Sequence, residues 1–269
     1  MTTKIKHFQK KVYAYYYKHG RNLPWRKTRN PYHIFISEVM LQQTQVETVL
    51  KKYHPFLKAF PSFRALSYAP LREILALWKG LGYNRRALFL KKSAKKVTHE
   101  FSARFPPEAE ILATLPGIGQ ATAKATVVFA FNKPEVFLET NIRRVFIHHF
   151  FSVKKRVSDS EILPLVERTL DVSNPRIWYW ALMDYGSALK KTHPNPNRKS
   201  AHYTKQARFK GSDRQIRGKI LEVLIVHPYL SRPMIFSKIN ASQNQIMRCL
   251  LSLQKEGFIT YTKNRFHII

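Results

Sequence analysis

One carboxyl group stands in a setting that would change its acidity. Glu38 lies within Ile34-Phe-Ile-Ser-Glu-Val-Met-Leu41, a strongly apolar segment. Loss of water favours the neutral form of a carboxyl group, so burial would raise the pKa of Glu38. A carboxylic acid that stays protonated near neutral pH can give its proton to a leaving group. The ordinary alternative is a solvated helix carboxylate, and the apolar flank argues against it.

A second segment has the composition of an anion-binding turn. Leu115-Pro-Gly-Ile-Gly119 lies between two helical stretches. Gly117 and Gly119 allow the backbone to turn tightly and to approach a phosphate without a clashing Cβ. Gly119 would also open a helix, whose free N–H groups favour an anion. We expect a helix-hairpin-helix that binds DNA phosphate, with an unliganded Pro-Gly turn as the plainer alternative.

The charge of the chain indicates the same kind of partner. Its 47 Lys and Arg residues against 16 Asp and Glu residues give a formal net charge of +31. Such an excess repels itself unless an anionic partner screens it, and DNA releases counterions when its phosphates are neutralised. Signal-like and membrane-spanning apolar runs are absent from the sequence. We therefore expect a monomeric, intracellular protein associated with DNA, in the cytoplasm or nucleoid.

The elements that must position these residues are helices. Apolar residues recur at helical spacing in five runs before residue 190, and few segments there alternate with period two. The fold class is therefore predicted to be all-α. The runs cover residues 32–50, 71–78, 85–100, 157–170 and 176–189.

The last third of the chain is organised differently. Residues 190–210 contain basic residues and prolines but no acidic residue, which indicates an extended basic linker. These basic residues are Lys190, Lys191, Arg198, Lys199, Lys205, Arg208 and Lys210. We predict a domain over residues 1–189, a linker over 190–211 and a small domain over 212–269.

The small domain has the pattern of a winged helix-turn-helix. Helices are predicted over residues 213–226, 232–239 and 242–256, and residues 258–269 have the pattern of a β-hairpin that turns near Lys263-Asn264. A winged helix usually lays its third helix in a DNA groove. A protein-binding module of the same shape is the alternative.

Three separated motifs carry a resemblance to a known family. Ser37-Glu-Val-Met-Leu-Gln-Gln-Thr-Gln-Val46 resembles the corresponding segment of MutY-type adenine glycosylases, in the helix-hairpin-helix superfamily, almost residue for residue. Leu23-Pro-Trp-Arg26 and Gly80-Leu-Gly-Tyr83 stand at the spacings of the same family. The resemblance covers about residues 20–190. It implies a helix-hairpin-helix glycosylase that hydrolyses adenine, opposite 8-oxoguanine or guanine, from double-stranded DNA.

The resemblance implies two catalytic carboxyl groups. Glu38 would protonate the departing adenine. Glu139 stands in Glu-Thr-Asn-Ile-Arg-Arg-Val145, where the family has Asp. It would stabilise the positive charge of the sugar and orient water, and Asn141 would hold the carboxylate and the water. Because Glu is longer than Asp by one methylene, a weakened or relocated charge is the alternative.

The resemblance also implies binding roles. Arg26 and Asp184 would line the adenine pocket. Leu41, Gln43 and Tyr83 would enter the duplex and fill the gap that the flipped nucleotide leaves. Core packing is the alternative for Leu41 and Tyr83. The carbonyl groups of three hairpin residues would hold a monovalent cation beside the phosphate; these are Ala113, Leu115 and Ile118.

The chain departs from relatives at three places. Bifunctional relatives carry a Schiff-base lysine where this chain has Ala121. Lys124 lies one helical turn further on, and we expect it to be a surface residue. No strand-cleaving (lyase) activity is therefore expected. The family's four cysteines for a [4Fe–4S] cluster are missing, since Asn197 holds one position and Cys249 is the sole cysteine. We therefore expect no cluster and no cofactor beyond the cation. A winged-helix candidate stands where the family has a domain that senses 8-oxoguanine.

Two other functions remain open. A glycosylase for thymine or uracil opposite guanine could share Leu-Pro-Trp-Arg and Glu38, although the Gln42-Gln43 pair favours the adenine branch. A non-catalytic DNA-binding or regulatory protein is suggested by the winged helix and by Glu139. Release of a free base from lesion-containing DNA would separate the three.

Overall fold

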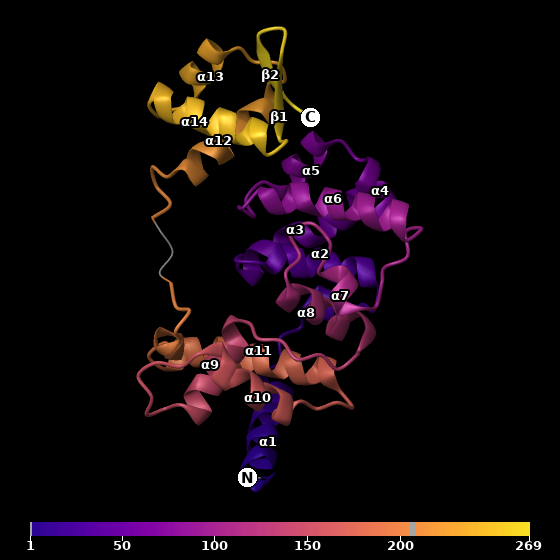
Figure 1. Cartoon of the computed structure of the whole chain (residues 1–269), viewed down its shortest axis with the longest axis vertical. Coiled ribbons are helices and arrows are strands. Elements are labelled where there is room, and N and C mark those ends of the chain that lie inside the picture. The colour runs from indigo at the N-terminus through magenta and orange to yellow at the C-terminus, as the bar shows by residue number, and fades with distance from the viewer. Residues whose placement is uncertain (1, 205–207) are drawn as a thin grey trace. The chain divides into compact units, whose positions relative to one another are not determined.

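The computed structural model describes residues 2–204 and 208–269, which are mostly helical (Figure 1). The predicted all-α class is confirmed. In chain order the elements are α1 (Thr2–His19), η1 (Pro24–Arg26), α2 (Pro31–Leu41), α3 (Val46–Ala59), α4 (Phe63–Tyr68), α5 (Leu71–Trp78), α6 (Arg85–Glu100), α7 (Ala109–Leu112), α8 (Gln120–Phe131), α9 (Thr140–Phe150), α10 (Asp159–Thr169), α11 (Pro175–Thr192), η2 (Pro196–Lys199), α12 (Asp213–Val226), α13 (Arg232–Lys238), α14 (Gln243–Lys255), β1 (Ile259–Thr262) and β2 (Arg265–Ile268).

Side-chain caps explain where several helices begin. The hydroxyl groups of Ser62 and Ser242 accept hydrogen bonds from the backbone N–H groups three residues later, at the starts of α4 and α14. Ser158 and Glu161 form a capping box at the start of α10. Each cap satisfies a backbone donor that the helix itself leaves without an acceptor.

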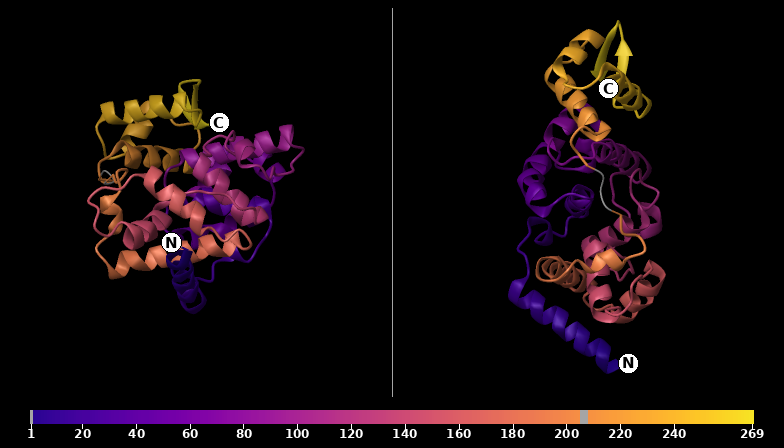
Figure 2. Two further views of the ribbon diagram at one scale, coloured as in Figure 1. Left: turned by 60° about the horizontal axis from the view of Figure 1, so that its bottom comes forward. Right: turned by 90° about the vertical axis from the view of Figure 1, so that its left-hand side faces the viewer.

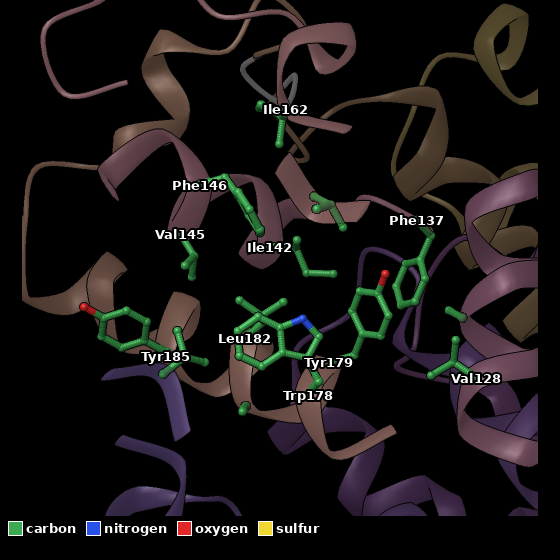
Figure 3. Packing of buried hydrophobic residues seen from close by; sticks show 14 of the residues in the cluster. Val128, Phe137, Ile142, Val145, Phe146, Ile162, Trp178, Tyr179, Leu182 and Tyr185 are labelled. Atoms are coloured by element: carbon green, nitrogen blue, oxygen red, sulfur yellow. The ribbon is translucent and has the colours of Figure 1, made fainter. Parts of the chain in front are cut away.

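The chain divides into two compact units. The first comprises Met1–Phe35, Pro107–Thr114 and Ile118–Lys205. Its core lies between α9 and α11, where Trp178 and Tyr179 of α11 are fully buried. Figure 3 shows these two rings facing Ile142 of α9, and the Tyr179 ring stacks on Phe137 with 4.1 Å between centroids. This apolar contact fixes α9, which carries Asn141, against α11, which carries Asp184.

The second unit comprises Ile36–Pro106, Leu115–Gly117 and Gln206–Ile269. Helix α4 packs on α6, and α12 packs on both α14 and α5. Trp78 and Phe56 are fully buried and meet edge to face, with 5.8 Å between ring centroids. The unit thus joins the segment around Glu38 with the C-terminal elements.

The C-terminal elements follow the predicted order of three helices and a hairpin, drawn in orange and yellow in Figure 2. Strands β1 and β2 pair antiparallel, with Thr262 opposite Arg265. Lys263 and Asn264 form the connecting turn with φ values of 47° and 59°, the left-handed conformation that a tight hairpin requires. The predicted hairpin and its turn are confirmed, and the DNA-binding role of a winged helix stays a prediction.

Two segments differ from the sequence-based expectation. The run predicted over residues 32–50 is two helices, because the chain turns between α2 and α3 and Gln43 takes a φ of 53°. The basic segment is only partly extended. Lys190 and Lys191 lie in the last turn of α11, and η2 packs against α9. Lys205 lies outside the described residues.

The described residues contain no candidate for a membrane-spanning helix. None of their helices is both long enough and apolar enough to traverse a bilayer.

Candidate active site

The carboxylate of Glu139 is held by the start of α9. The backbone N–H groups of Asn141 and Ile142 donate to its Oε1 at 2.8 and 2.7 Å, and Asn141 Nδ2 donates to Oε2 at 3.1 Å. Burial raises the pKa of Glu139, although these N–H groups and the charges of Arg144 and Arg143 act against the rise. The structure thus brings Glu139 and Asn141 together. The longer side chain folds back onto the N-terminus of its own helix.

Arg144 connects this carboxylate to α11. Its Nη1 donates to Asn141 Oδ1 at 2.8 Å and to the carbonyl oxygen of Gly186 at 2.7 Å. An ideal Cβ on Gly186 would lie 2.3 Å from the carbonyl oxygen of Asn141, so only glycine fits where the two helices touch. The orientation of Asn141 therefore depends on the close approach of α9 to α11.

A second pair of predicted residues meets in the same unit. Asp184 accepts Arg26 Nη1 and Nη2 at 2.7 and 2.8 Å, and it also accepts the backbone N–H and Nε of Arg21 at 2.8 and 2.7 Å. The side chains of Arg26 and Asp184 are 7% and 1% exposed. Burial alone would raise the pKa of Asp184, but the hydrogen bonds and charges of Arg26 and Arg21 hold it below its ordinary value. These four donors fill the acceptor capacity of the carboxylate.

A basic cavity of about 280 Å³ lies beside Arg26. It is lined by four cationic side chains and no carboxylate, and burial together with the charge of Arg29 lowers the pKa of Arg176. This lining suits an anion better than an uncharged base. The lining residues are Arg26, Lys27, Thr28, Arg29, Asn132, Asn174, Arg176, Ile177 and Trp180.

The hairpin turns at Gly117 and enters α8 at Gly119, whose φ of −87° is an ordinary value for any residue. Gly119 is the N-cap of α8, whose own hydrogen bonds begin with Ala123 N–H donating to the Gly119 carbonyl at 2.9 Å. Gly117 has a φ of 77°, and a Cβ there would lie 2.6 Å from the Phe89 ring. Ser93 donates to the carbonyl of Pro116 at 3.0 Å. The Pro116–Gly117 turn is therefore held by α6, and binding of a phosphate at the start of α8 stays a prediction.

Glu38 lies near the C-terminal end of α2 and belongs to the second unit, whereas Glu139 belongs to the first. Its neighbours Ser37, Val39 and Met40 are buried, while Glu38 itself is partly exposed. Leu41, the last residue of α2, is also partly exposed. The apolar neighbours agree with the predicted segment, but Glu38 is less buried than the sequence predicts, and its role as a general acid stays a prediction.

Gln43 and Tyr83 occupy two loops with left-handed backbone, at φ values of 53° and 47°. Such a conformation costs roughly 1–2 kcal/mol for a residue with a Cβ. Arg86 joins the two loops. Its Nη2 donates to Thr44 Oγ1 at 2.8 Å and to the carbonyls of Leu81 and Gly82 at 2.9 and 3.0 Å.

Arg86 also binds the C-terminal end of α2. Its Nη1 donates to the carbonyls of Val39 and Met40 at 2.8 Å each. Its guanidinium lies 5.8 Å from the centre of the Tyr83 ring, a contact worth about 0.5–1 kcal/mol. Burial lowers the pKa of Arg86 to about 10, which leaves it charged at neutral pH. One buried cation therefore positions both loops predicted to enter DNA.

Sequence reasoning missed four residues that organise these sites: Arg21, Arg86, Arg144 and Gly186. Arg144 stands inside the Glu139–Val145 motif, but its partner Gly186 lies 42 residues further along the chain. Arg21 lies 163 residues from Asp184, and the sequence near it carries no sign of the contact.

The segment that follows α11 does not fit an iron–sulfur cluster. Four thiolates would be needed, and the sole cysteine, Cys249, is buried in α14. Asn197, at one of the family's cysteine positions, is instead buried and donates from Nδ2 to the carbonyl of Thr140 at 2.9 Å. Asn195 Oδ1 accepts Arg144 Nε at 3.3 Å. These residues therefore tie the segment to the start of α9.

Fold and site together define a helical protein with a glycine-containing hairpin before α8 and a carboxylate held at the start of α9. The family model described as HhH-GPD superfamily base excision DNA repair protein matches residues 36–168. The adenine DNA glycosylase of Mycolicibacterium smegmatis is 32% identical over 229 residues, which cover 78% of each chain. The chain therefore belongs to the HhH-GPD superfamily and, within it, to the adenine DNA glycosylase family.

A second adenine DNA glycosylase and a solved glycosylase structure are also similar to this chain. The adenine DNA glycosylase of Buchnera aphidicola subsp. Baizongia pistaciae is 38% identical over 200 residues, which are 73% of this chain and 56% of that protein. The chain thus spans little more than half the length of that relative. A solved structure of a thermostable thymine-DNA glycosylase is similar with a TM-score of 0.62 and 27% identity, over 69% of this chain and 87% of that one.

Proposed function

We propose that this chain removes adenine opposite 8-oxoguanine or guanine from double-stranded DNA by hydrolysis of the N-glycosidic bond. The observation that carries the proposal is the carboxylate of Glu139, fixed at the start of α9 beside Asn141 in a chain of this family. A helix N-terminus holds the charge in place without the need for reorganisation during the reaction.

The reaction divides between the two carboxyl groups. Glu38 donates a proton to a ring nitrogen of adenine, so the C–N bond breaks and its electron pair leaves with a neutral base. The sugar is left with positive charge, which the ionised Glu139 stabilises. A water molecule then adds to the sugar carbon and gives a proton to the Glu38 carboxylate, which restores the acid and completes hydrolysis. Glu139 Oε2 accepts Asn141 Nδ2 and retains acceptor capacity for this water.

Arg26 is the better candidate for a contact with the base than Asp184. The carboxylate of Asp184 already accepts four hydrogen bonds from Arg21 and Arg26. We assign Asp184 the role of holding the Arg26 guanidinium, which also lies 5.4 Å from the Trp180 ring centre. Arg26 can then orient adenine with a fixed donor.

DNA would be held at several places. The Gly117–Gly119 turn and the first amides of α8 bind phosphate, and the carbonyls of Ala113, Leu115 and Ile118 supply oxygen ligands to a monovalent cation. Leu41, Gln43 and Tyr83 enter the duplex at the flipped nucleotide. Residues 212–269 act as a winged helix that adds a second DNA contact, with Lys263 and Arg265 at the hairpin.

Strand cleavage is not part of the proposed activity. Ala121 lies exposed in the first turn of α8 and offers no amine for a Schiff base. Lys124, the nearest lysine on that helix, lies 3.7 Å from Glu135 as an ion pair. The proposed enzyme is therefore monofunctional and needs no iron–sulfur cluster.

A panel of duplexes tests the proposal. Each duplex carries one defined pair (adenine opposite 8-oxoguanine, guanine or thymine, and thymine or uracil opposite guanine), and free base is measured by chromatography under single-turnover conditions. Adenine released from the 8-oxoguanine and guanine pairs supports the proposal. Release of thymine or uracil without adenine would assign the chain to mismatch repair of pyrimidines, and no release from any duplex would indicate a non-catalytic DNA-binding protein.

A further inference from the structure

The C-terminal elements contact the segment that carries Tyr83, within the second unit. Arg72 of α5 donates from Nε to the carbonyl of Ile225 in α12 at 2.8 Å. Lys79 pairs with Glu222, and Arg85 Nε lies 3.0 Å from Glu256 Oε2. Three contacts of this kind flank the Gly80–Tyr83 loop on both sides in sequence.

The contact between α12 and the loop itself is Arg214. Its Nη1 donates to the Tyr83 hydroxyl at 2.8 Å, and its guanidinium lies 5.6 Å from the centre of the Tyr83 ring. Arg86 contacts the same ring at 5.8 Å. Tyr83 therefore contacts two guanidinium groups, one from α6 and one from α12, the first helix of the C-terminal domain (residues 212–269).

These two arginines hold the side chain of a residue whose backbone is strained. A φ of 47° is disfavoured for a residue with a bulky side chain, so the ring must be held by its surroundings. Arg86 is occupied by backbone carbonyls of α2 and of the Tyr83 loop, and its guanidinium lies beside the Tyr83 ring. The hydroxyl end is reached by Arg214, a residue outside the part of the chain that the family model matches.

We propose that Arg214 is a positioning residue for Tyr83, through which the C-terminal domain controls how well the Tyr83 loop opens the duplex. The inference rests on the proposed insertion of Tyr83 into DNA. It gives the C-terminal domain a role besides phosphate binding: loss of Arg214 should impair duplex opening more than it impairs DNA affinity.

The test compares variants of the full chain. Arg214→Ala removes both contacts with Tyr83, Arg214→Lys keeps a donor without the planar group, and Tyr83→Phe removes the hydroxyl alone. Lys219→Ala is the matched control, because it removes one positive charge from the same helix at a partly exposed residue. Duplex opening is measured by the fluorescence of 2-aminopurine placed next to the target adenine, and affinity by anisotropy of a labelled duplex.

We expect Arg214→Ala to reduce the fluorescence gain at saturation by about half and the single-turnover rate of adenine release about tenfold. Its affinity should fall no more than that of Lys219→Ala, and Arg214→Lys should be intermediate. In a Tyr83→Phe background the effect of Arg214→Ala should shrink to about threefold, because part of the interaction is already lost.

Different results would overturn different claims. Equal effects of Arg214→Ala and Lys219→Ala on every readout, or full additivity with Tyr83→Phe, would refute the positioning role. Absence of any fluorescence gain with the wild-type chain would refute it as well. A normal gain that depends on Arg214, with no free adenine, would instead refute the proposed reaction and leave the positioning role standing.

Discussion

Gly186 offers a direct test of how the site is built, through the change Gly186→Ala. The added Cβ would lie 2.3 Å from the carbonyl oxygen of Asn141, 2.8 Å from its carbonyl carbon and 2.9 Å from its Cβ. Ordinary contact begins at 3.4 Å, so α9 and α11 must separate by about 1 Å. Asn141 carries two of the hydrogen bonds that hold Glu139, and its movement therefore displaces the Glu139 carboxylate.

The expected magnitudes follow from this overlap. Overpacking costs about 1–3 kcal/mol, and alanine regains roughly 1 kcal/mol of helix propensity, so the net loss of stability is about 0–2 kcal/mol. That loss lowers Tm by no more than about 8 °C for a chain of this size. Misplacement by about 1 Å can reduce the rate on the order of a hundredfold.

The assay combines thermal unfolding with single-turnover release of adenine at saturating enzyme. Gly218→Ala in α12 is the matched control, because no atom lies within 4 Å of the Cβ that it would add. The control should keep its rate, and its Tm should stay the same or rise by a few degrees, because alanine has the higher helix propensity. If Gly186→Ala retained the wild-type rate and melting temperature, the tight α9–α11 contact would not position the site, and the reasoning would be refuted.

Three further predictions concern the same site. Asn197→Ala should lower Tm by a few degrees and slow adenine release, because it removes the hydrogen bond to the Thr140 carbonyl at the start of α9. Arg198→Ala, at an exposed neighbour, should leave Tm unchanged, and equal melting temperatures of the two variants would contradict this prediction. Burial raises the pKa of Glu139, and the ionised form is the one proposed to act, so the rate of adenine release should fall at a higher pH than it would with an ordinary glutamate. This acid-side fall in rate should be absent from the pH profile of Glu139→Gln. Borohydride should trap no covalent complex with DNA, and an efficient adduct that disappears in Lys124→Ala would show that the chain has lyase chemistry after all.

Local pattern was sufficient for most helices and for the hairpin. The apolar spacing of residues 71–78 and 85–100 predicts α5 and α6 with the bounds that the structure shows, because each helix buries one face against a neighbour. The pair Lys263-Asn264 was likewise recognisable as a turn. These features depend on interactions between residues close in sequence.

The contacts that orient the site could not be predicted in this way. The break between α2 and α3 depends on Arg86, more than forty residues further along the chain, which donates to the carbonyls at the end of α2. The basic segment folds onto α9 because Asn197 finds a partner in Thr140, 57 residues away. Sequence patterns indicate which helices form. The hydrogen bonds between residues far apart in the chain are determined only when those helices pack together.

The most direct test of the proposed function is the release of adenine by the wild-type chain and by Glu38→Gln, measured under single-turnover conditions on a duplex with adenine opposite 8-oxoguanine. Glutamine keeps the shape of the side chain but has no acidic proton to donate, so the rate should fall on the order of a hundredfold or more while the affinity for the duplex stays within about threefold. Glu139→Gln should be similarly impaired, because it removes the charge that stabilises the sugar. Release of adenine by Glu38→Gln at the wild-type rate would contradict the account.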